Sequence, residues 1–400
     1  HADQLECITS PFAAIQKLNG DPSLTTTAPG CDLFDPSQAN FSAALALARA
    51  ADVVVVGLGI ETCGLNARHN VNPARPGRCY QEKSTTGYVF PDQYTELEAH
   101  DRTTIALPPV QEAFAAAVLA LNKPTLIFFM NAGAVAFDAI DGARRSGNST
   151  DAPLAIVEAF YPGVRGGEAL AESIFGETNA WGRLPYTIYP LSFEQDAAMT
   201  MHDLRVSPGR TYRYFRDPLY PFGAGLSLTQ WSVTSALAPP ACSLATTDTK
   251  TPCEVTLSVK NTGTLSGDCV LLAYFAKNAT DADWYKRRAY PAAASTLPPD
   301  VAPADLLSPL RELFDYTRLH DVAPGETRSV TFAVTAKTLA LVDESTGDLV
   351  AQAGEYAMMF DSGAGFMKDE ATEGGMLTLR AKVTGKDVVV TPFPSQKRAD

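Results

Sequence analysis

The stretch DVVVVG at residues 52–57 decides the class of the first half of the chain. Four successive valines that end in glycine are typical of a strand buried on both faces of a sheet. Two further apolar runs, TLIFFM at 125–130 and LAIVEAF at 154–160, have the same character. We therefore predict three buried strands in this half of the chain.

Helical segments separate these strands. An alanine-rich stretch at 43–51 precedes the first strand, and an amphipathic stretch at 109–121 precedes the second. A third helix, at 167–175, follows the last strand after a glycine-rich turn. Alternating strands and helices predict an α/β fold with a mostly parallel sheet. In such sheets, functional residues collect on the loops at the carboxyl ends of the strands.

The pattern changes after about Trp231, where short strands of period two begin. In 254–260 every second residue is Val or Leu, and two more strand-like segments, 329–335 and 354–360, follow turns. Short alternating strands separated by regular turns predict an antiparallel β-sandwich. The Pro- and Ala-rich stretch 290–304 is expected to form a long loop or an insertion.

The composition limits the classes of function. The chain of 400 residues has 45 acidic and 32 basic side chains, a formal net charge of −13 and 46% hydrophobic residues. At roughly 100–200 residues per domain, this length predicts two or three packed domains. The acidic balance, without a Lys/Arg cluster, argues against nucleic acid or an anionic membrane as the main partner. The best apolar stretch, 113–137, is interrupted by Asn, Lys and Pro, so we predict no membrane span.

Three N-x-S/T sequons, which begin at Asn40, Asn148 and Asn278, lie beside spaced cysteines. Together they favour a secreted or luminal glycoprotein with disulfides. The chain begins with His1 rather than Met and shows no signal-peptide pattern, so we expect a matured chain or a piece of a longer one. The expected location is extracellular or in the cell wall, or in a lysosome- or vacuole-like lumen.

The seven cysteines suggest pairs by sequence proximity. The predicted disulfides are Cys7–Cys31, Cys63–Cys79 and Cys242–Cys253. Cys269 is left over, either as a buried free thiol in an apolar strand or as one half of an intermolecular disulfide. No two cysteines form a CxxC pair and the five histidines are scattered, so we predict neither a metal site nor a cofactor.

Three long motifs carry a family resemblance. They are YPGVRGGEALAESIFGETNAWGRLPYTIYP at 161–190, PGRTYR at 208–213 and PFGAGLSLT at 221–229. This pattern resembles the carboxyl-terminal part of glycoside hydrolase family 3, and CITSPF at 7–12 resembles the start of that region in the β-xylosidase branch. In the second half, VKNTGTLSGD, PLRELFDYTRL and APGETRSVTF resemble the family's fibronectin type III-like domain.

The resemblance gives the expected domain organisation. Residues 1–230 form the α/β sandwich domain, with an insertion at 61–93 that the family lacks, and 231–385 form the fibronectin type III-like β-sandwich. Residues 386–400 show no clear periodicity and are expected to be a surface tail. The insertion leaves the carboxyl end of the first strand. It is interpreted as an extra specificity loop, as a plug, or as a surface for another protein.

The resemblance also implies the chemistry. Retaining glycosidases use one carboxylate as nucleophile and a second as acid/base. In family 3 the nucleophilic Asp lies in an amino-terminal TIM-like barrel that this sequence does not contain, so the implied partner is a barrel domain on the same precursor or on another chain. The implied substrate is a β-linked oligosaccharide that is cleaved from its non-reducing end.

The acid/base Glu of the xylosidase branch lies in a motif that resembles I-E-A-E-x-x-D-R. Residues 94–108, YTELEAHDRTTIALP, fit this register. Glu96 then falls on the acid/base position, whereas Glu98, Asp101 and Arg102 are expected to bind substrate or to support the loop. Glu61 is the alternative acid/base if the insertion follows the motif. The competing interpretation is that Glu96 and Glu98 are ordinary solvated carboxylates.

Two functions remain open at this point. The first is an enzyme, the carboxyl-terminal portion of a secreted β-xylosidase-like exo-glycosidase. The second is a non-catalytic structural or interaction protein of an extracellular assembly that kept the fold of this family without its chemistry.

Overall fold

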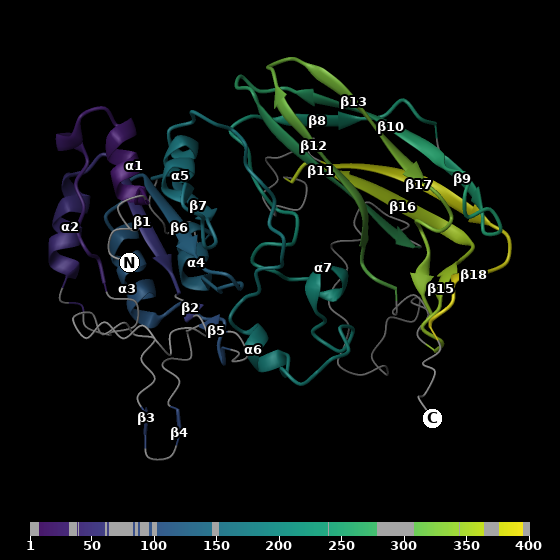
Figure 1. The fold of residues 1–400 in the computed structure, drawn as a ribbon, viewed down its shortest axis with the longest axis horizontal. Coiled ribbons are helices and arrows are strands. Elements are labelled where there is room, and N and C mark those ends of the chain that lie inside the picture. Colours follow the sequence, from purple (N-terminus) through teal and green to yellow (C-terminus); the bar gives the residue numbers. More distant parts are fainter. Residues whose placement is uncertain are drawn as a thin grey trace. The chain divides into compact units, whose positions relative to one another are not determined.

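We describe the protein from a computed structural model (Figure 1). It describes residues 8–31, 38, 40–60, 62–63, 83–84, 87–88, 96–97, 102–145, 152–238, 240–277, 308–343, 345–363 and 376–394, with 62–63, 83–84, 87–88, 97 and 143–145 described by their backbone alone. The chain divides into two compact units, and we describe each by itself. The first unit comprises His1–Glu177, Ile188–Asp196 and Asp217–Leu219; the second comprises Thr178–Thr187, Ala197–Arg216 and Tyr220–Asp400.

A three-stranded parallel sheet forms the centre of the first unit, in the order β1-β6-β7 (Figure 1). Its strands are β1 (Val54–Gly59), β6 (Thr125–Met130) and β7 (Leu154–Glu158). Their register pairs Val54 with Thr125, and Thr125 with Leu154. The predicted parallel sheet is therefore confirmed, and the first strand continues beyond DVVVVG to Gly59.

Helices connect and cover these strands. The crossovers β1–α3–β6 and β6–α4–β7 run in the same direction across the sheet, and right-handed crossovers then place both helices on one face. Helix α3 contacts both α2 and α4, and α1 contacts α5. The helices of this unit are α1 (Pro11–Leu18), η2 (Pro22–Leu24), α2 (Phe41–Ala50), α3 (Pro109–Leu119), α4 (Asp138–Arg145), α5 (Gly166–Ile174) and α6 (Phe193–Asp196).

Four short strands accompany the predicted insertion. β2 (Thr62–Cys63) pairs in parallel with β5 (Glu96–Leu97), so that Thr62 is the register partner of Glu96. β3 (Lys83–Ser84) pairs antiparallel with β4 (Gly87–Tyr88). The other residues of 61–93 lie outside the described part of the chain. The β2–β5 pair connects the chain that leaves β1 to the strand that carries Glu96.

The second unit is built around a β-sandwich. One sheet has the order β13-β10-β8 and the other β12-β11-β16-β17-β9. A small third sheet has the order β14-β15-β18, and a short helix, α7 (Thr211–Tyr214), also belongs to this unit. The strands are β8 (Trp231–Thr234), β9 (Cys242–Ala245), β10 (Cys253–Asn261), β11 (Gly267–Lys277), β12 (Glu312–Val322), β13 (Thr327–Val334), β14 (Leu341–Val342), β15 (Leu349–Ala351), β16 (Gly354–Asp361), β17 (Met376–Thr384) and β18 (Val388–Thr391).

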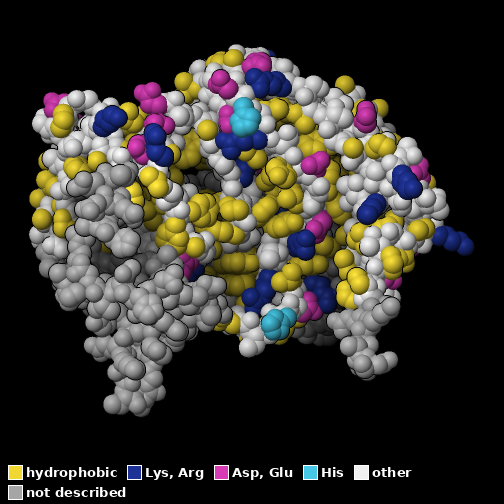
Figure 2. Space-filling view, in the orientation of Figure 1, with side chains coloured by type: hydrophobic (Ala, Val, Ile, Leu, Met, Phe, Trp, Pro, Cys, Tyr) yellow, Lys and Arg dark blue, Asp and Glu magenta, His cyan; other side chains and the backbone are white. Residues whose placement is uncertain are grey.

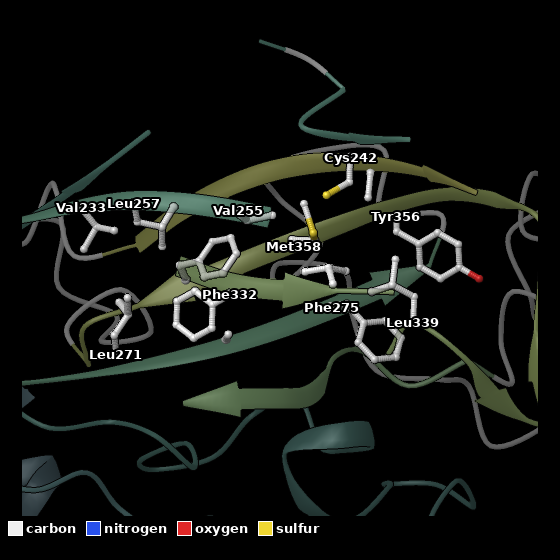
Figure 3. Packing of buried hydrophobic residues seen from close by; sticks show 14 of the residues in the cluster. Val233, Cys242, Val255, Leu257, Leu271, Phe275, Phe332, Leu339, Tyr356 and Met358 are labelled. Carbon is white, nitrogen blue, oxygen red and sulfur yellow. The ribbon is translucent and has the colours of Figure 1, made fainter. Parts of the chain in front are cut away.

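The two large sheets bury one apolar core between them. Val255, Leu257 and Val259 of β10 are fully buried, whereas the residues between them are exposed, as the alternating sequence predicts. Figure 3 shows side chains of both sheets directed toward one another, among them Phe332 of β13 and Phe275 of β11. The inward-facing residues of every second position thus form the core of the sandwich.

Two features of the second unit differ from the sequence prediction. Strand β9 pairs in parallel with β17, so the larger sheet is mixed at this edge rather than antiparallel throughout. The segment 386–400, expected to be a surface tail, contains β18, which pairs with β15. Valines at 388–390 explain this strand, because β-branched side chains favour extended structure.

The cysteines of the sandwich take two forms. Cys242 of β9 and Cys253 of β10 form a disulfide, as predicted, with their Cα atoms 5.8 Å apart, and this bond joins the two sheets. Cys269 of β11 is free and fully buried, which agrees with the first of its two alternatives. Burial raises the pKa of the Cys269 thiol to about 12, against the opposite effect of Arg183.

The surface shows no block of a single charge on the visible face. In Figure 2, acidic and basic side chains are interspersed with hydrophobic ones over the coloured residues. Among the residues that the structure describes, no helix has both the length and the apolar character needed to cross a membrane.

Candidate active site

The three parallel strands end at one edge, where their following residues lie close together. The N–H of Ile60, after β1, donates to the carbonyl of Met130 at 3.1 Å, and the N–H of Ala159, after β7, donates to the carbonyl of Phe129 at 2.9 Å. Asn131 is fully buried and its Nδ2 donates to the carbonyl of Gly133 at 2.9 Å, which shapes the turn after β6. This edge is the place where a parallel sheet positions functional side chains.

Glu96 lies at this edge, and its carboxyl group contacts the loops that follow β6 and β7. The N–H of Gly133 donates to Oε1 at 2.6 Å, and the N–H of Ala132 donates to Oε2 at 2.8 Å. Tyr161 Oη lies 2.7 Å from Oε2. Only 13% of the Glu96 side chain is exposed. The carboxyl group is thus fixed in position by backbone groups as well as by side chains.

Arg102 supports the same group from the other side. Its Nη2 donates to the carbonyl of Ala134 at 2.9 Å and lies 3.6 Å from Glu96 Oε1, with 12% of the side chain exposed. A Cβ on Gly133 would come within 2.8 Å of Arg102 Nη2 and 2.9 Å of Glu96 Oε1. A side chain at 133 would displace the arginine or the carboxylate, so glycine at this position allows their close approach.

Tyr161 follows β7 in a turn that directs the chain back over the edge. Phe160, before it, has a φ of 54°, which is unusual for a residue with a side chain. The N–H of Phe160 donates to Glu158 Oε1 at 3.2 Å, which helps to hold this conformation. Tyr161 Oη lies 3.0 Å from the carbonyl oxygen of Ile60, in addition to its contact with Glu96. Tyr161 thus links the ends of β1 and β7.

The sequence analysis missed Gln111, a buried polar residue on α3. Its side chain is 2% exposed and forms a pair of hydrogen bonds with Gly59 at the end of β1. The N–H of Gly59 donates to Gln111 Oε1 at 2.8 Å, and Gln111 Nε2 donates to the carbonyl of Gly59 at 2.7 Å. The sequence offered only a glutamine within a mostly apolar helical stretch. That it lies beside Gly59 in the fold could not be seen from the sequence, because the two residues are 52 positions apart.

Gly59 itself could not be another residue. Its φ is 147°, and a Cβ there would lie 2.0 Å from the carbonyl oxygen of Met130. β1 is an edge strand of the described sheet, so the N–H and carbonyl of Gly59 on its open side have no strand partner, and Gln111 binds both. Gln111 and Gly59 together fix the start of the loop that continues to Ile60.

The remaining predicted residues fall into two groups. Asn40 is exposed immediately before α2, and its glycosylation stays a prediction. Cys31 forms no disulfide with the cysteines whose side chains are described, and its pairing with Cys7 stays a prediction. The other predicted positions lie outside the described residues, namely Cys7, the side chain of Cys63, Cys79, Glu98, Asp101, Asn148 and Asn278, as does Glu61.

The chemistry available at this edge is that of the Glu96 carboxyl group, which is fixed in position among hydrogen-bond donors. In the described part of the chain, the Glu96 carboxyl group contacts the loops after both β6 and β7. No group of three or more His, Cys, Asp or Glu side chains in that part is arranged to hold a metal ion. Proton transfer to or from a bound molecule is the reaction that such a carboxyl group can perform.

Two family models match the chain, one over the part that contains the parallel sheet and the other within the β-sandwich. The model of the glycosyl hydrolase family 3 C-terminal domain matches residues 2–228, and that of the fibronectin type III-like domain matches 300–363. The first match covers more than half of the chain and includes every residue described above at the strand ends and on α3.

The chain also resembles individual proteins. It is 30% identical over 387 residues to a probable exo-1,4-β-xylosidase, bxlB, of Aspergillus clavatus, a match that covers 92% of this chain and 40% of the relative. It is 30% identical over 277 residues to a xylan 1,4-β-xylosidase of Xylanibacter ruminicola, which covers 69% of this chain and 27% of the relative. The chain therefore spans less than half of the length of these relatives.

Solved structures show the same fold. A family 3 exo-β-xylosidase, XlnD, in complex with a xylobiose aziridine probe has a TM-score of 0.72 at 23% identity, over 98% of this chain and 43% of that one. A β-glucosidase of Listeria innocua in complex with isofagomine has a TM-score of 0.62 at 18% identity, over 95% of this chain and 43% of that one.

Proposed function

Because the chain belongs to glycosyl hydrolase family 3, we propose that it is the carboxyl-terminal portion of a secreted β-xylosidase-like exo-glycosidase. It hydrolyses O-glycosidic bonds of β-linked glycans with retention of configuration. The chain supplies the acid/base side of the active site, and a barrel domain on the same precursor or on a partner chain supplies the nucleophile. No cofactor is required, because two carboxyl groups suffice for this reaction.

The observation that carries this proposal is the fixed carboxyl group of Glu96 at the carboxyl edge of the sheet. An acid/base residue must lie at a defined position so that its proton is aligned with the leaving oxygen. Two backbone N–H groups, Tyr161 and Arg102 hold Glu96 in this way. We assign to Glu96 the protonation of the leaving oxygen and, in the second step, the activation of water.

The proposed supporting residues follow from the same arrangement. Arg102 braces the turn after β6 through the carbonyl of Ala134. Glu98 and Asp101, which lie next to these residues in the sequence, are proposed to bind substrate or to support the loop. Secretion is supported by the disulfide between Cys242 and Cys253 and by the exposed position of Asn40 in its sequon.

The test compares how much activity Glu96→Gln loses on substrates with different leaving groups. It uses the protein as isolated, together with any barrel domain that accompanies it. Cleavage of xylobiose needs an acid, whereas release of 2,4-dinitrophenolate from its β-xyloside does not. We expect kcat/KM for xylobiose to fall by about 10²–10⁴-fold, and kcat/KM for the dinitrophenyl xyloside by less than about 10-fold. Equal losses on both substrates contradict the acid assignment.

A non-catalytic interaction protein is the second candidate, and one observation favours it. The Glu96 carboxyl group contacts the loops after β6 and β7 and lies beside Arg102, so it can anchor these two loops without any substrate. If the isolated protein leaves aryl β-xyloside and aryl β-glucoside untouched, the enzymatic proposal fails. In that case Glu96 has only an anchoring role, and Glu96→Gln should lower the thermal stability of the protein.

A further inference from the structure

The contacts of Tyr161 contain more acceptors than its hydroxyl has protons. Tyr161 Oη lies 2.7 Å from Glu96 Oε2 and 3.0 Å from the carbonyl oxygen of Ile60. A phenolic hydroxyl carries one proton, so it donates one strong hydrogen bond at a time. A carbonyl oxygen has no proton to return, whereas a carboxyl group has one when it is protonated. Both short contacts are therefore hydrogen bonds at once only when Glu96 provides the second proton.

Two arrangements keep a hydrogen bond between Tyr161 and Glu96, and only the first makes both short contacts hydrogen bonds. In the first, protonated Glu96 donates from Oε2 to Tyr161 Oη, and Tyr161 donates to the carbonyl of Ile60. In the second, Glu96 is ionised and Tyr161 donates to Oε2. The second lacks the Glu96 proton and has the Tyr161 hydroxyl proton turned from Ile60 to Oε2, and no heavy atom has to move. The N–H groups of Ala132 and Gly133 hold the carboxyl oxygens in both arrangements.

We propose that Tyr161 is a positioning residue that holds the acid proton on Oε2 of Glu96 and follows its departure and return. This inference rests on the proposed acid/base role of Glu96. As the glycosidic bond breaks, its electron pair goes to the leaving oxygen, which takes the proton from Oε2. The Tyr161 hydroxyl keeps its own proton and turns it from Ile60 to the new carboxylate. In the second step a proton from water returns to Oε2, and the hydroxyl turns back.

The fold keeps both acceptors of Tyr161 in place. Ile60 follows Gly59, whose N–H and carbonyl groups are both bound by the buried Gln111 side chain. Glu96 Oε1 faces Arg102 at 3.6 Å, on the side away from the Tyr161 contact to Oε2. Each carboxyl oxygen accepts one backbone N–H, but only Oε1 faces the Arg102 cation, so charge favours the proton on Oε2.

The test is Tyr161→Phe, which keeps the ring and removes only the hydroxyl. In the protein as isolated, we expect kcat/KM for xylobiose to fall by about 10–100-fold, a part of the ~10²–10⁴-fold that a positioned acid contributes. The dinitrophenyl xyloside should lose less than about 3-fold, because its leaving group needs no proton. In the double variant with Glu96→Gln, Tyr161→Phe should add no further loss, since it acts only through the carboxyl group.

A second readout does not require activity. The infrared band of the Glu96 carboxylic acid is identified as the band that disappears in Glu96→Gln. This band should shift in Tyr161→Phe, because the Glu96 proton then loses the Tyr161 oxygen as its acceptor. Tyr356→Phe is the matched control, because it removes a hydroxyl that donates to the carbonyl of Gln352 at 2.9 Å within the sandwich. It should change neither the band nor the ratio of the two substrates.

The outcomes separate the two proposals. Equal losses on both substrates together with an unshifted band overturn the role of Tyr161. An isolated protein without glycosidase activity overturns the proposed function instead, and the band alone then decides whether the Glu96 proton lies toward Tyr161.

Discussion

The edge of the parallel sheet and the core of the sandwich are held together by opposite means. At the edge, Gln111, Glu96 and Tyr161 each bind backbone groups of strand ends through one or two polar contacts. In the sandwich, a cluster of apolar side chains from two sheets fills the interior, and Phe360 and Leu257 within it are fully buried. The edge thus depends on a few specific pairs, and the core on the sum of many contacts.

The difference has a physical consequence for mutation. Removal of one polar partner at the edge leaves the other buried without a hydrogen bond, which costs about 1–3 kcal/mol. Removal of a core side chain creates a cavity, which weakens the packing of the whole sheet pair. Variants at the edge should therefore lower stability less than variants in the core, and should also loosen the strand end that loses its partner.

The largest effect is expected in the core. Phe360 of β16 is fully buried, with its ring centroid 5.2 Å from that of Phe332 and 6.3 Å from that of Phe314. Phe360→Ala should lower the free energy of unfolding of the second unit by about 3–5 kcal/mol. Urea unfolding followed by tryptophan fluorescence measures this unit, because Trp181, Trp231 and Trp284 all belong to it.

The control for this change is an exposed aromatic residue of the same sandwich. Tyr316 of β12 is 68% exposed, so Tyr316→Ala should alter the free energy of unfolding by no more than about 0.5 kcal/mol. A loss below about 1 kcal/mol for Phe360→Ala would mean that the core relaxes into the cavity, and that its stability is less collective than the packing indicates.

A smaller and more local effect is expected at Gln111. Methionine has nearly the same volume but no hydrogen-bonding groups, so Gln111→Met leaves the N–H and carbonyl of Gly59 buried without partners. We expect the first unit to lose about 2 kcal/mol of unfolding free energy. Hydrogen exchange followed by mass spectrometry should show faster exchange in peptides that contain Gly59 and Ile60, and much less change in β7.

Gln16→Met is the matched control on another helix of the same unit. Gln16 Nε2 donates to the carbonyl of Pro22 at 3.1 Å in an exposed setting, where water can replace it. Its loss should cost less than about 0.5 kcal/mol. If both variants behave alike, the buried pair at Gly59 contributes no more than an exposed contact.

The contrast between edge and core also explains what the sequence could predict. The core of β10 follows from its alternation alone, because each second residue faces inward whatever the partner strand is. The parallel sheet follows from continuous runs such as 125–130, which match β6 residue for residue. Strand pairing order does not follow from such local patterns, and the parallel β9–β17 pair was therefore not predicted.

The site was predictable only in part. Glu96 and Arg102 came from a motif, but the groups that hold Glu96 are distant in sequence, at Ala132, Gly133 and Tyr161. Backbone N–H groups have no sequence signature, and the role of Tyr161 depends on the left-handed turn at Phe160. Such contacts are decided by tertiary structure. For the same reason the sequence does not show that Gln111, a polar residue on a mostly apolar helix, binds Gly59.

The smallest effect is expected at an ion pair between β11 and β12 of the sandwich. There a carboxyl group, Asp268, binds both side chains and a backbone N–H. Asp268 Oδ2 lies 2.7 Å from Arg318 Nε and 3.0 Å from His320 Nδ1, and the N–H of Asp321 donates to Oδ1 at 2.9 Å. Burial acts to raise the pKa of Asp268, but the hydrogen bonds from these groups outweigh it and lower the pKa below its ordinary value. A carboxyl group with a lowered pKa stabilises the fold above its unfolded pKa of about 3.9 and loses this contribution as the pH falls through its folded pKa.

Asp268→Asn should therefore cost about 1 kcal/mol of unfolding free energy at pH 7, and the difference from wild type should shrink below about pH 4. Fluorescence-monitored urea unfolding at several pH values measures it. The control is Glu355→Gln, whose partner Lys382 lies 3.9 Å away with both side chains more than half exposed, and which should have no measurable effect. Equal effects at the two sites, or a difference that does not depend on pH, would mean that burial does not decide the value of a polar contact here, and the contrast between the polar edge and the apolar core would lose its physical basis.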